Sequence, residues 1–211
     1  MSTRHLFLFG GSPPFNKTLG KKFAQLSLND HGKIAILFIK RPGWEKYMKK
    51  YTEVLEANGV NQFNYIPLNA NPTHAEVENL KSCTGMIICG GETELYQRYL
   101  VGTIFGEEII LMYQRGVPLA GFSAGALVSP DQCVISPVDN TKNEHLFLKG
   151  LGLIENCVVS VHFSKWNEER NLITAKNKIN AAVGYGIDDE GSLYFANEHL
   201  VENLSEHFYV F

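Results

Sequence analysis

The chain has 211 residues, of which 45% are hydrophobic and 19% charged, a composition typical of a globular protein with a sizeable core. Its formal net charge of −3 provides no basic face for nucleic acid and no polybasic patch for a membrane. No apolar run approaches the roughly 20 residues that span a bilayer, and the N-terminal apolar stretch is shorter than that of a signal peptide. The four cysteines form no CxxC pair, so we expect reduced thiols, no metal site and a cytoplasmic protein.

Apolar runs that predict strands alternate with amphipathic patterns that predict helices along the first part of the chain. We expect strands at 5–9, 33–39, 62–68, 85–90 and 117–121, and helices within 15–26, 44–59 and 73–83. Thr73 is placed as a helix N-cap with Glu76 at the capping-box position. Strands separated by helices predict βαβ units and a mainly parallel sheet.

Beyond residue 129 the pattern changes to short strand-like runs around one amphipathic helix. The runs are 132–138, 157–163, 184–188 and 192–196, and the helical pattern covers 167–183. No repeat, low-complexity tract or linker interrupts the chain, which predicts a single domain over residues 1–211.

Glycine-rich loops follow three of the predicted strands, with the sequences "FGGSPP", "CGGETE" and "AGFSAG". Ligands of open parallel sheets gather outside the carboxyl ends of the strands. We therefore expect these three loops to outline a site at one edge of the sheet.

Ser123 lies between two glycines where the run "VPLAG" ends and a helix could begin. In this G-x-S-x-G pattern the turn lifts the serine oxygen clear of the backbone, and Gly121 and Gly125 relieve crowding. The backbone N–H of Ala124 is then a natural donor to an oxyanion. An ordinary small-residue turn with a helix-capping serine would give the same local pattern.

A serine nucleophile needs a base, and His162 is the best-placed histidine. It ends a predicted strand and precedes a predicted helix, which puts it at the same sheet edge as Ser123. A structural histidine at such a position is the competing interpretation.

Four segments, in this order along the chain, resemble peptidase family S51, the serine peptidases that include dipeptidase E and cyanophycinase. They are "GGETELYQRYL" (90–100), "PLAGFSAGALV" (118–128), "VSVHF" (159–163) and "GYGIDDEGSLYF" (184–195). The resemblance implies a three-layer α/β/α sandwich with a mainly parallel sheet, similar to class I glutamine amidotransferases and flavodoxin. It also implies a serine nucleophile at Ser123, a histidine base at His162, and no metal or other cofactor.

The same resemblance implies that the backbone N–H of Gly91 completes an oxyanion hole with Ala124. The third triad member has two candidates. Asp139 lies close to where the dipeptidase branch carries its acid, and Asp189 matches the acid of the cyanophycinase branch. We favour Asp139 slightly, with Asp189 as the alternative.

Three further residues are expected to contact substrate. Glu92 stands where family members often have asparagine, and Arg170 matches the later of two arginines that aspartyl dipeptidases carry after "HF". Asn167 occupies the earlier arginine position, so the sequence predicts broad or altered specificity rather than strict preference for N-terminal aspartate.

The leading hypothesis is a serine hydrolase that cleaves a peptide or related amide bond in a small substrate through an acyl-enzyme on Ser123. One alternative is a non-catalytic binding or regulatory protein that retains the fold. Another is acyl transfer to an acceptor other than water. We expect no nucleic acid or membrane partner, and the chain would act as a monomer or homodimer.

Overall fold

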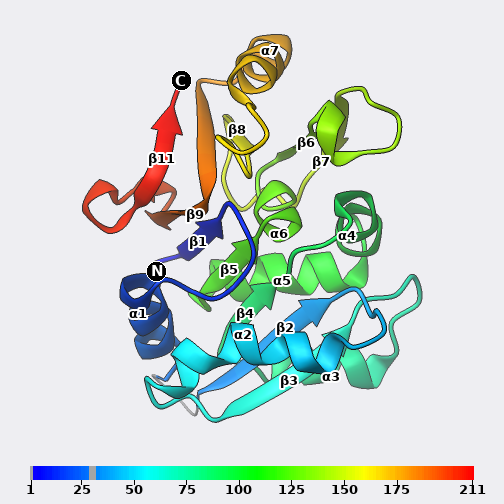
Figure 1. The fold of residues 1–211 in the computed structure, drawn as a ribbon. Helices are drawn as coiled ribbons and strands as arrows, with labels where there is room; N and C mark the ends of the chain where they lie inside the picture. Colours follow the sequence, from blue (N-terminus) through cyan, green and yellow to red (C-terminus); the bar gives the residue numbers. More distant parts are fainter. Residues whose placement is uncertain (1, 29–31) are drawn as a thin grey trace.

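The structure is a computed structural model that describes residues 2–28 and 32–211, and a mixed β-sheet runs through its centre (Figure 1). Five parallel strands stand side by side in the order β1 (His5–Phe9), β5 (Leu119–Phe122), β4 (Gly85–Ile88), β2 (Lys33–Phe38) and β3 (Gln62–Pro67). Because helices cover both faces, β1, β2, β4 and β5 are apolar and buried at nearly all successive positions, whereas the edge strand β3 is largely exposed or half-buried.

The second part of the chain adds a strand that runs against the others. β9 (Val183–Ala196) pairs antiparallel with β1, and it also pairs with β8 (Cys157–Ser160), β10 (His199–Leu200) and β11 (Glu206–Val210). β6 (Gln132–Ile135) and β7 (Leu146–Lys149) form a separate two-stranded sheet.

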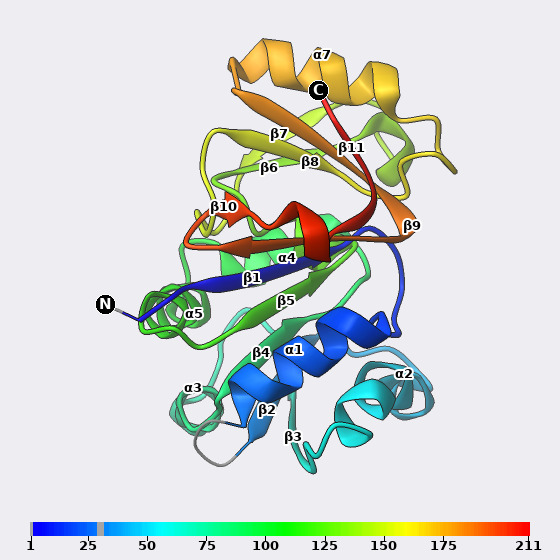
Figure 2. The ribbon, with the colours of Figure 1, turned by 90° about the vertical axis from the view of Figure 1, so that its left-hand side faces the viewer.

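The helices form the two outer layers (Figure 2). α1 (Lys17–Ser27) and α2 (Trp44–Glu56) cover one face of the parallel strands. α3 (His74–Lys81) and α5 (Ile104–Gln114) cover the other face, and α4 (Thr93–Leu100) packs against α5. α7 (Glu169–Ile179) lies over β8 and β9. The expected α/β fold with a mainly parallel sheet and three layers is confirmed.

Helix starts follow the chemistry of their capping residues. Thr73 accepts a hydrogen bond from the Glu76 backbone N–H, and the Glu76 carboxylate accepts one from the Thr73 backbone N–H. This reciprocal pair confirms the predicted capping box. Asn16 caps α1 in the simpler way, by accepting from the backbone N–H of Leu19.

The structure differs from the sequence prediction in two ways. The runs at 184–188 and 192–196 belong to one continuous strand, β9, whose first part pairs with β8 and β11 and whose second part pairs with β1. The polar residues between them suggest a hairpin turn, but here the strand continues through them. In addition, the predicted elements did not include α4, α5, β7, β10 and β11.

Among the described residues, none of the helices combines the length and apolar character needed to span a bilayer.

Candidate active site

Ser123 stands on the turn between β5 and α6 (Ala124–Leu127), in a backbone conformation that non-glycine residues rarely adopt, with φ 48° and ψ −106°. A Cβ on Gly121 would lie 2.5 Å from the carbonyl oxygen of Gly125, and one on Gly125 would lie 2.2 Å from that of Ile88. The positions two residues before and two residues after the serine therefore exclude any side chain. The sharp turn requires glycine at both of them.

A row of hydrogen bonds starts at the Ser123 hydroxyl. Its Oγ lies 3.1 Å from His162 Nε2, and His162 Nδ1 lies 2.9 Å from Asp189 Oδ1. The His162 side chain is 12% exposed, and that of Asp189 is 37% exposed. With Nδ1 protonated toward the carboxylate, Nε2 is free to accept the serine proton.

The loop after β1 packs against both His162 and the segment that carries Asp189. The Gly10 carbonyl accepts the backbone N–H of His162 at 3.0 Å, which helps to hold that residue at a φ of 50°. A Cβ on Gly10 or Gly11 would lie 2.3 Å from the carbonyl oxygens of Asp188 or Asp189 respectively. The glycines thus let the β1 loop pass directly against the segment that carries Asp189. On its other side, the His162 ring packs on Trp166, with ring centroids 4.3 Å apart.

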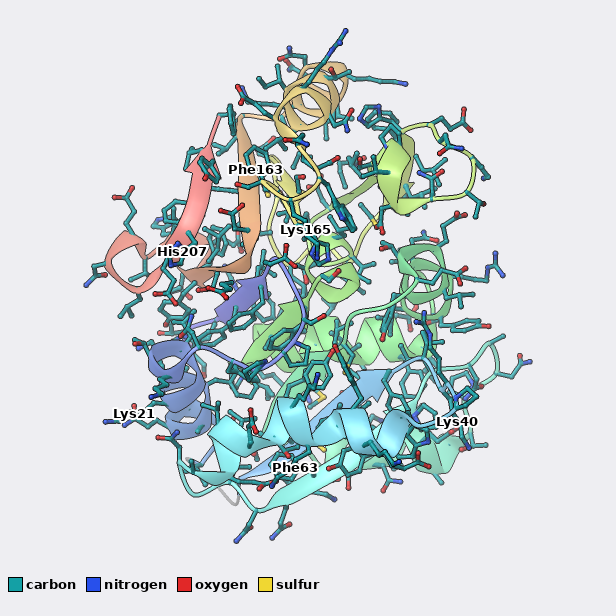
Figure 3. All side chains as sticks on the ribbon, in the orientation of Figure 1. Lys21, Lys40, Phe63, Phe163, Lys165 and His207 are labelled. Carbon is teal, nitrogen blue, oxygen red and sulfur yellow. The ribbon has the colours of Figure 1, made fainter. Side chains whose placement is uncertain are left out.

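Charge around Asp189 favours its ionised form. Partial burial would raise the pKa of this carboxyl, but the hydrogen bond and charge of His162 outweigh that effect. Lys165 Nζ, 3.3 Å from the same Oδ1, acts in the same direction, so the pKa is lowered overall. Figure 3 labels Lys165 between the helices that Figure 1 labels α6 and α7.

Asp139, at the end of a short 3-10 helix (Pro137–Asp139), has a different partner. Its Oδ2 accepts a hydrogen bond from Thr93 Oγ1 at 3.0 Å, and it makes none to His162. Burial raises the pKa of this carboxyl, with Thr93 and His162 opposing the rise. The slight preference for Asp139 as the partner of His162 therefore needs correction. Asp189 occupies that position because β9 carries it past the Gly10–Gly11 loop.

Of the two residues expected to form an oxyanion hole, Ala124 follows Ser123 directly and Gly91 lines the same cleft as Ser123. Ala124 is the first residue of α6, so its N–H has no acceptor within the helix. The Gly90 N–H is already used by Tyr51 Oη at 3.0 Å, and the Gly90 carbonyl accepts from Tyr96 Oη at 3.1 Å. No acceptor within residues 2–28 and 32–211 takes the Gly91 N–H. Gly91 also has a φ of 156°, which favours glycine.

Ser123 and His162 open into a cleft of about 620 Å³, within the usual size range for small-molecule sites. Arg41, Trp44, Tyr47, Tyr51 and Tyr96 line it, as do Glu92, Asp139 and Trp166. Glu92 is exposed and precedes α4 without a side-chain capping bond.

Among the described residues, no group of three or more His, Cys, Asp or Glu side chains could hold a metal ion.

Asn167 and Arg170 lie elsewhere. They line a second hollow of about 650 Å³ together with Phe163, Ile173 and Tyr209, and neither lines the cleft of Ser123. Asn167 has a φ of 54°, and the chain turns there before α7 begins. The structure thus does not bring these two residues to Ser123.

Sequence reasoning missed several side chains of the cleft. Trp44, Tyr47, Met48 and Tyr51 recur at helical spacing, which is typical of a core-facing stripe, but Trp44 is only half-buried and Tyr47 is exposed. Glu168, which does not line this cleft, was also missed, although it is only 2% exposed and accepts hydrogen bonds from Ser136, Ser160 and Asn171. A charged residue just before an amphipathic helix gives no sequence signal of burial.

Known proteins resemble this chain in both sequence and fold. A cyanophycinase from Trichormus variabilis is 31% identical over 136 residues, which is 61% of this chain and 44% of that protein. One from Geminocystis herdmanii is 26% identical over 133 residues, or 61% and 49% of the two chains. The matched region therefore spans less than half the length of these relatives.

Two solved structures share the fold. A peptidase from an acI-B1 Actinobacterium gives a TM-score of 0.68 at 20% identity, covering 99% of this chain and 87% of that one. A candidate peptidase E protein from Listeria monocytogenes gives 0.68 at 19% identity, covering 98% and 99%. The model of peptidase family S51 matches residues 6–202. Since this match spans nearly the whole chain, the protein belongs to peptidase family S51.

Proposed function

We propose that this peptidase is of the serine type and cleaves a peptide or related amide bond in a small substrate through an acyl-enzyme on Ser123. The observation that carries the proposal is the continuous row from Ser123 Oγ through His162 to Asp189, with contacts of 3.1 and 2.9 Å. A nucleophile, a base and an orienting acid in contact are the parts that this chemistry requires.

In the first half of the reaction, His162 Nε2 takes the Ser123 proton while Oγ bonds to the scissile carbonyl carbon. The N–H groups of Gly91 and Ala124 stabilise the negative charge that develops on the carbonyl oxygen. His162 then gives its proton to the leaving nitrogen, and the carbon–nitrogen bond breaks. The acyl group remains as an ester on Ser123.

Water completes the cycle. His162 accepts a proton from a water molecule, whose oxygen attacks the ester carbon, and Ser123 recovers its proton as the ester breaks. Asp189 stays ionised throughout: it holds the Nδ1–H tautomer and stabilises the transient imidazolium. Its lowered pKa supports this role at neutral pH.

The size and composition of the cleft support a short substrate. Aromatic side chains and a few charged groups line about 620 Å³, and the oxyanion loop lies among them. The hollow lined by Asn167 and Arg170 is separate, so these residues do not serve as the arginine pair of an aspartyl dipeptidase in this proposal.

A fluorophosphonate probe combined with a dipeptide screen tests the proposal. We expect the wild type to be labelled on Ser123 and to hydrolyse dipeptides or β-aspartyl substrates, and Ser123→Ala to do neither. A wild type that binds dipeptides without labelling or turnover would identify a binding protein instead. Added amines that divert the acyl group would indicate a transferase.

A further inference from the structure

Two buried tyrosines contact the oxyanion loop, and the steps above give them no role. Tyr51 comes from α2, which covers one face of the sheet, and Tyr96 comes from α4, which packs against α5 on the other face (Figure 2). Tyr51 is 1% exposed and Tyr96 is 0% exposed. Their hydroxyl groups meet at Gly90, the residue before the expected oxyanion donor Gly91.

Each hydroxyl binds a different backbone group of Gly90. Tyr51 Oη accepts the Gly90 N–H at 3.0 Å, and Tyr96 Oη lies 3.1 Å from the Gly90 carbonyl oxygen. Since a carbonyl can only accept, Tyr96 donates this second bond, and its oxygen in turn accepts the Ile39 N–H at 3.3 Å. Burial raises the pKa of both tyrosines well above the usual range, so the hydroxyls stay neutral and keep their protons.

The bond from Tyr96 sets the direction of the Gly91 N–H. The Gly90 carbonyl and the Gly91 N–H belong to one trans peptide unit, which is planar and points these two groups in opposite directions. A carbonyl held by Tyr96 therefore turns the N–H away from Tyr96. A Cβ on Gly90 would lie 3.4 Å from Ser123 Cβ, so the loop that carries this N–H lies directly beside the nucleophile.

Tyr51 connects the same loop to the strand of the nucleophile. Its ring packs edge-on against that of Phe122, the residue before Ser123, with ring centroids 5.1 Å apart. The same side chain thus contacts β5 through its ring and the Gly90 N–H through its hydroxyl. Tyr51 therefore ties the loop of Gly91 to the turn that carries Ser123.

We propose that Tyr51 and Tyr96 are positioning residues that hold the backbone of Gly90 so that the Gly91 N–H is aimed at the carbonyl oxygen of the substrate. The inference rests on the proposed function and adds two side chains to it, both of which act through Gly90. Donors that are oriented in advance stabilise an oxyanion better than donors that must reorient during the reaction. Loss of these hydroxyls therefore lowers kcat and leaves substrate binding largely intact.

The chain offers a matched control in Tyr113, a tyrosine of α5 that is 2% exposed and lies outside the cleft. Tyr51→Phe, Tyr96→Phe and Tyr113→Phe each remove one buried oxygen and keep the ring. The readouts are kcat and KM on a dipeptide from the screen, the pH profile of kcat/KM, the saturating rate of fluorophosphonate labelling and the melting temperature.

We expect Tyr96→Phe to lower kcat and the labelling rate by roughly 10- to 100-fold with KM nearly unchanged, because outright loss of an oxyanion donor costs about 10²- to 10³-fold. Tyr51→Phe should lose less, since its hydroxyl holds the peptide unit before the one that carries the Gly91 N–H. Tyr113→Phe should keep the kinetics of the wild type. The midpoint of the acidic limb of the pH profile should stay at the wild-type value in all three variants, because the triad is intact.

An unchanged kcat in Tyr96→Phe, a rise in KM alone, or an equal loss of kcat in Tyr113→Phe would overturn the role of the tyrosines. A shifted acidic limb would also overturn it, because the damage would then lie in the triad. If Tyr96→Phe does not fold, Tyr51→Phe decides by the same criteria. A wild type that neither labels nor hydrolyses would instead overturn the proposed function, and this inference with it.

Discussion

The wall of the cleft that carries Ser123, His162 and Asp189 is fixed by hydrogen bonds at each residue, whereas the wall from Arg41 to Tyr47 is mostly exposed. On the first wall the Ser123 backbone N–H bonds to Phe9, and the His162 backbone N–H bonds to Gly10. On the second wall Tyr47 is 39% exposed, and Arg41 has no charged partner among the described residues.

This difference separates the two tasks of a peptidase. Bond breaking needs groups held to within fractions of an ångström, which the glycine-rich loops of the first wall provide by close backbone packing. Substrate choice needs groups that are still available for a partner. We therefore expect changes on the first wall to abolish turnover, and changes on the second to shift preference between substrates.

The largest effect should come from the nucleophile. Ser123→Ala should reduce kcat by about 10³- to 10⁶-fold while the melting temperature stays close to that of the wild type. His162→Ala should lose a similar amount, and the double variant no more than either, because the two residues act as a unit. Steady-state kinetics with matched thermal melts would check this. A double variant far slower than both single variants would separate His162 from Ser123.

The second effect distinguishes the two acids. Asp189→Asn should lower kcat by roughly 10⁴-fold, as loss of the orienting acid does in the serine-protease template, because His162 would no longer be held in the productive tautomer. Asp139→Asn should lose much less, since its carboxylate faces Thr93. Kinetics of the two variants measured side by side would decide, and collapse in Asp139→Asn with activity retained in Asp189→Asn would reverse the assignment.

The third effect concerns the packing of the first wall. Gly125→Ala should destabilise the fold by at least about 3 kcal/mol, because its new methyl would lie 2.2 Å from the Ile88 carbonyl oxygen. For a chain of this length that corresponds to a fall in melting temperature of roughly 6–12 °C. Gly102→Ala is the control: it has a φ of +69° but no neighbour within 4 Å, so it should cost only about 1–2 kcal/mol. Equal shifts in the two variants would disprove the packing argument.

The smallest effect is a pH dependence of stability. Burial raises the pKa of Asp139 in the folded chain, so ionisation of this carboxyl above that pKa opposes folding. Below the unfolded-state pKa of about 3.9, the carboxyl is protonated in both the folded and the unfolded chain, and this cost to stability vanishes. Asp139→Asn should therefore be at least as stable as the wild type at pH 7, and this relative advantage should shrink as pH falls toward 3. Melts across this range would check it. An advantage that grows on acidification would have the wrong sign.

Local patterns predicted the parts of the site that depend on neighbours in sequence. Ser123 stands in a strand–turn–helix pattern in which neighbouring backbone leaves no room for a side chain at Gly121 or Gly125. The Thr73–Glu76 capping box is equally local. His162 could be inferred because it follows an apolar run and precedes a helix, although its strand, β8, pairs with β9, which runs antiparallel to β1.

The acid and the specificity residues depend on contacts between distant segments, which periodicity does not report. Asp189 lies in a polar stretch that suggests a turn, and only the packing of Gly10 and Gly11 against it shows that the strand continues. Asn167 and Arg170 point into a different hollow because the chain turns at two residues with positive φ, His162 and Asn167. The contacts of Tyr51 and Tyr96 with Gly90 give no signal either, because both tyrosines fall on the buried face of a helix.

Activation of Ser123 by Asp189 through His162 is the central claim, and the rate of fluorophosphonate labelling measures it without any knowledge of the substrate. Intact-mass spectrometry would give that rate for the wild type, Asp189→Asn and Asp139→Asn. We predict a single adduct on Ser123 in the wild type, a labelling rate lowered by orders of magnitude in Asp189→Asn, and a rate close to the wild type in Asp139→Asn. Labelling that is unaffected in Asp189→Asn, or an unlabelled wild type, would contradict the account.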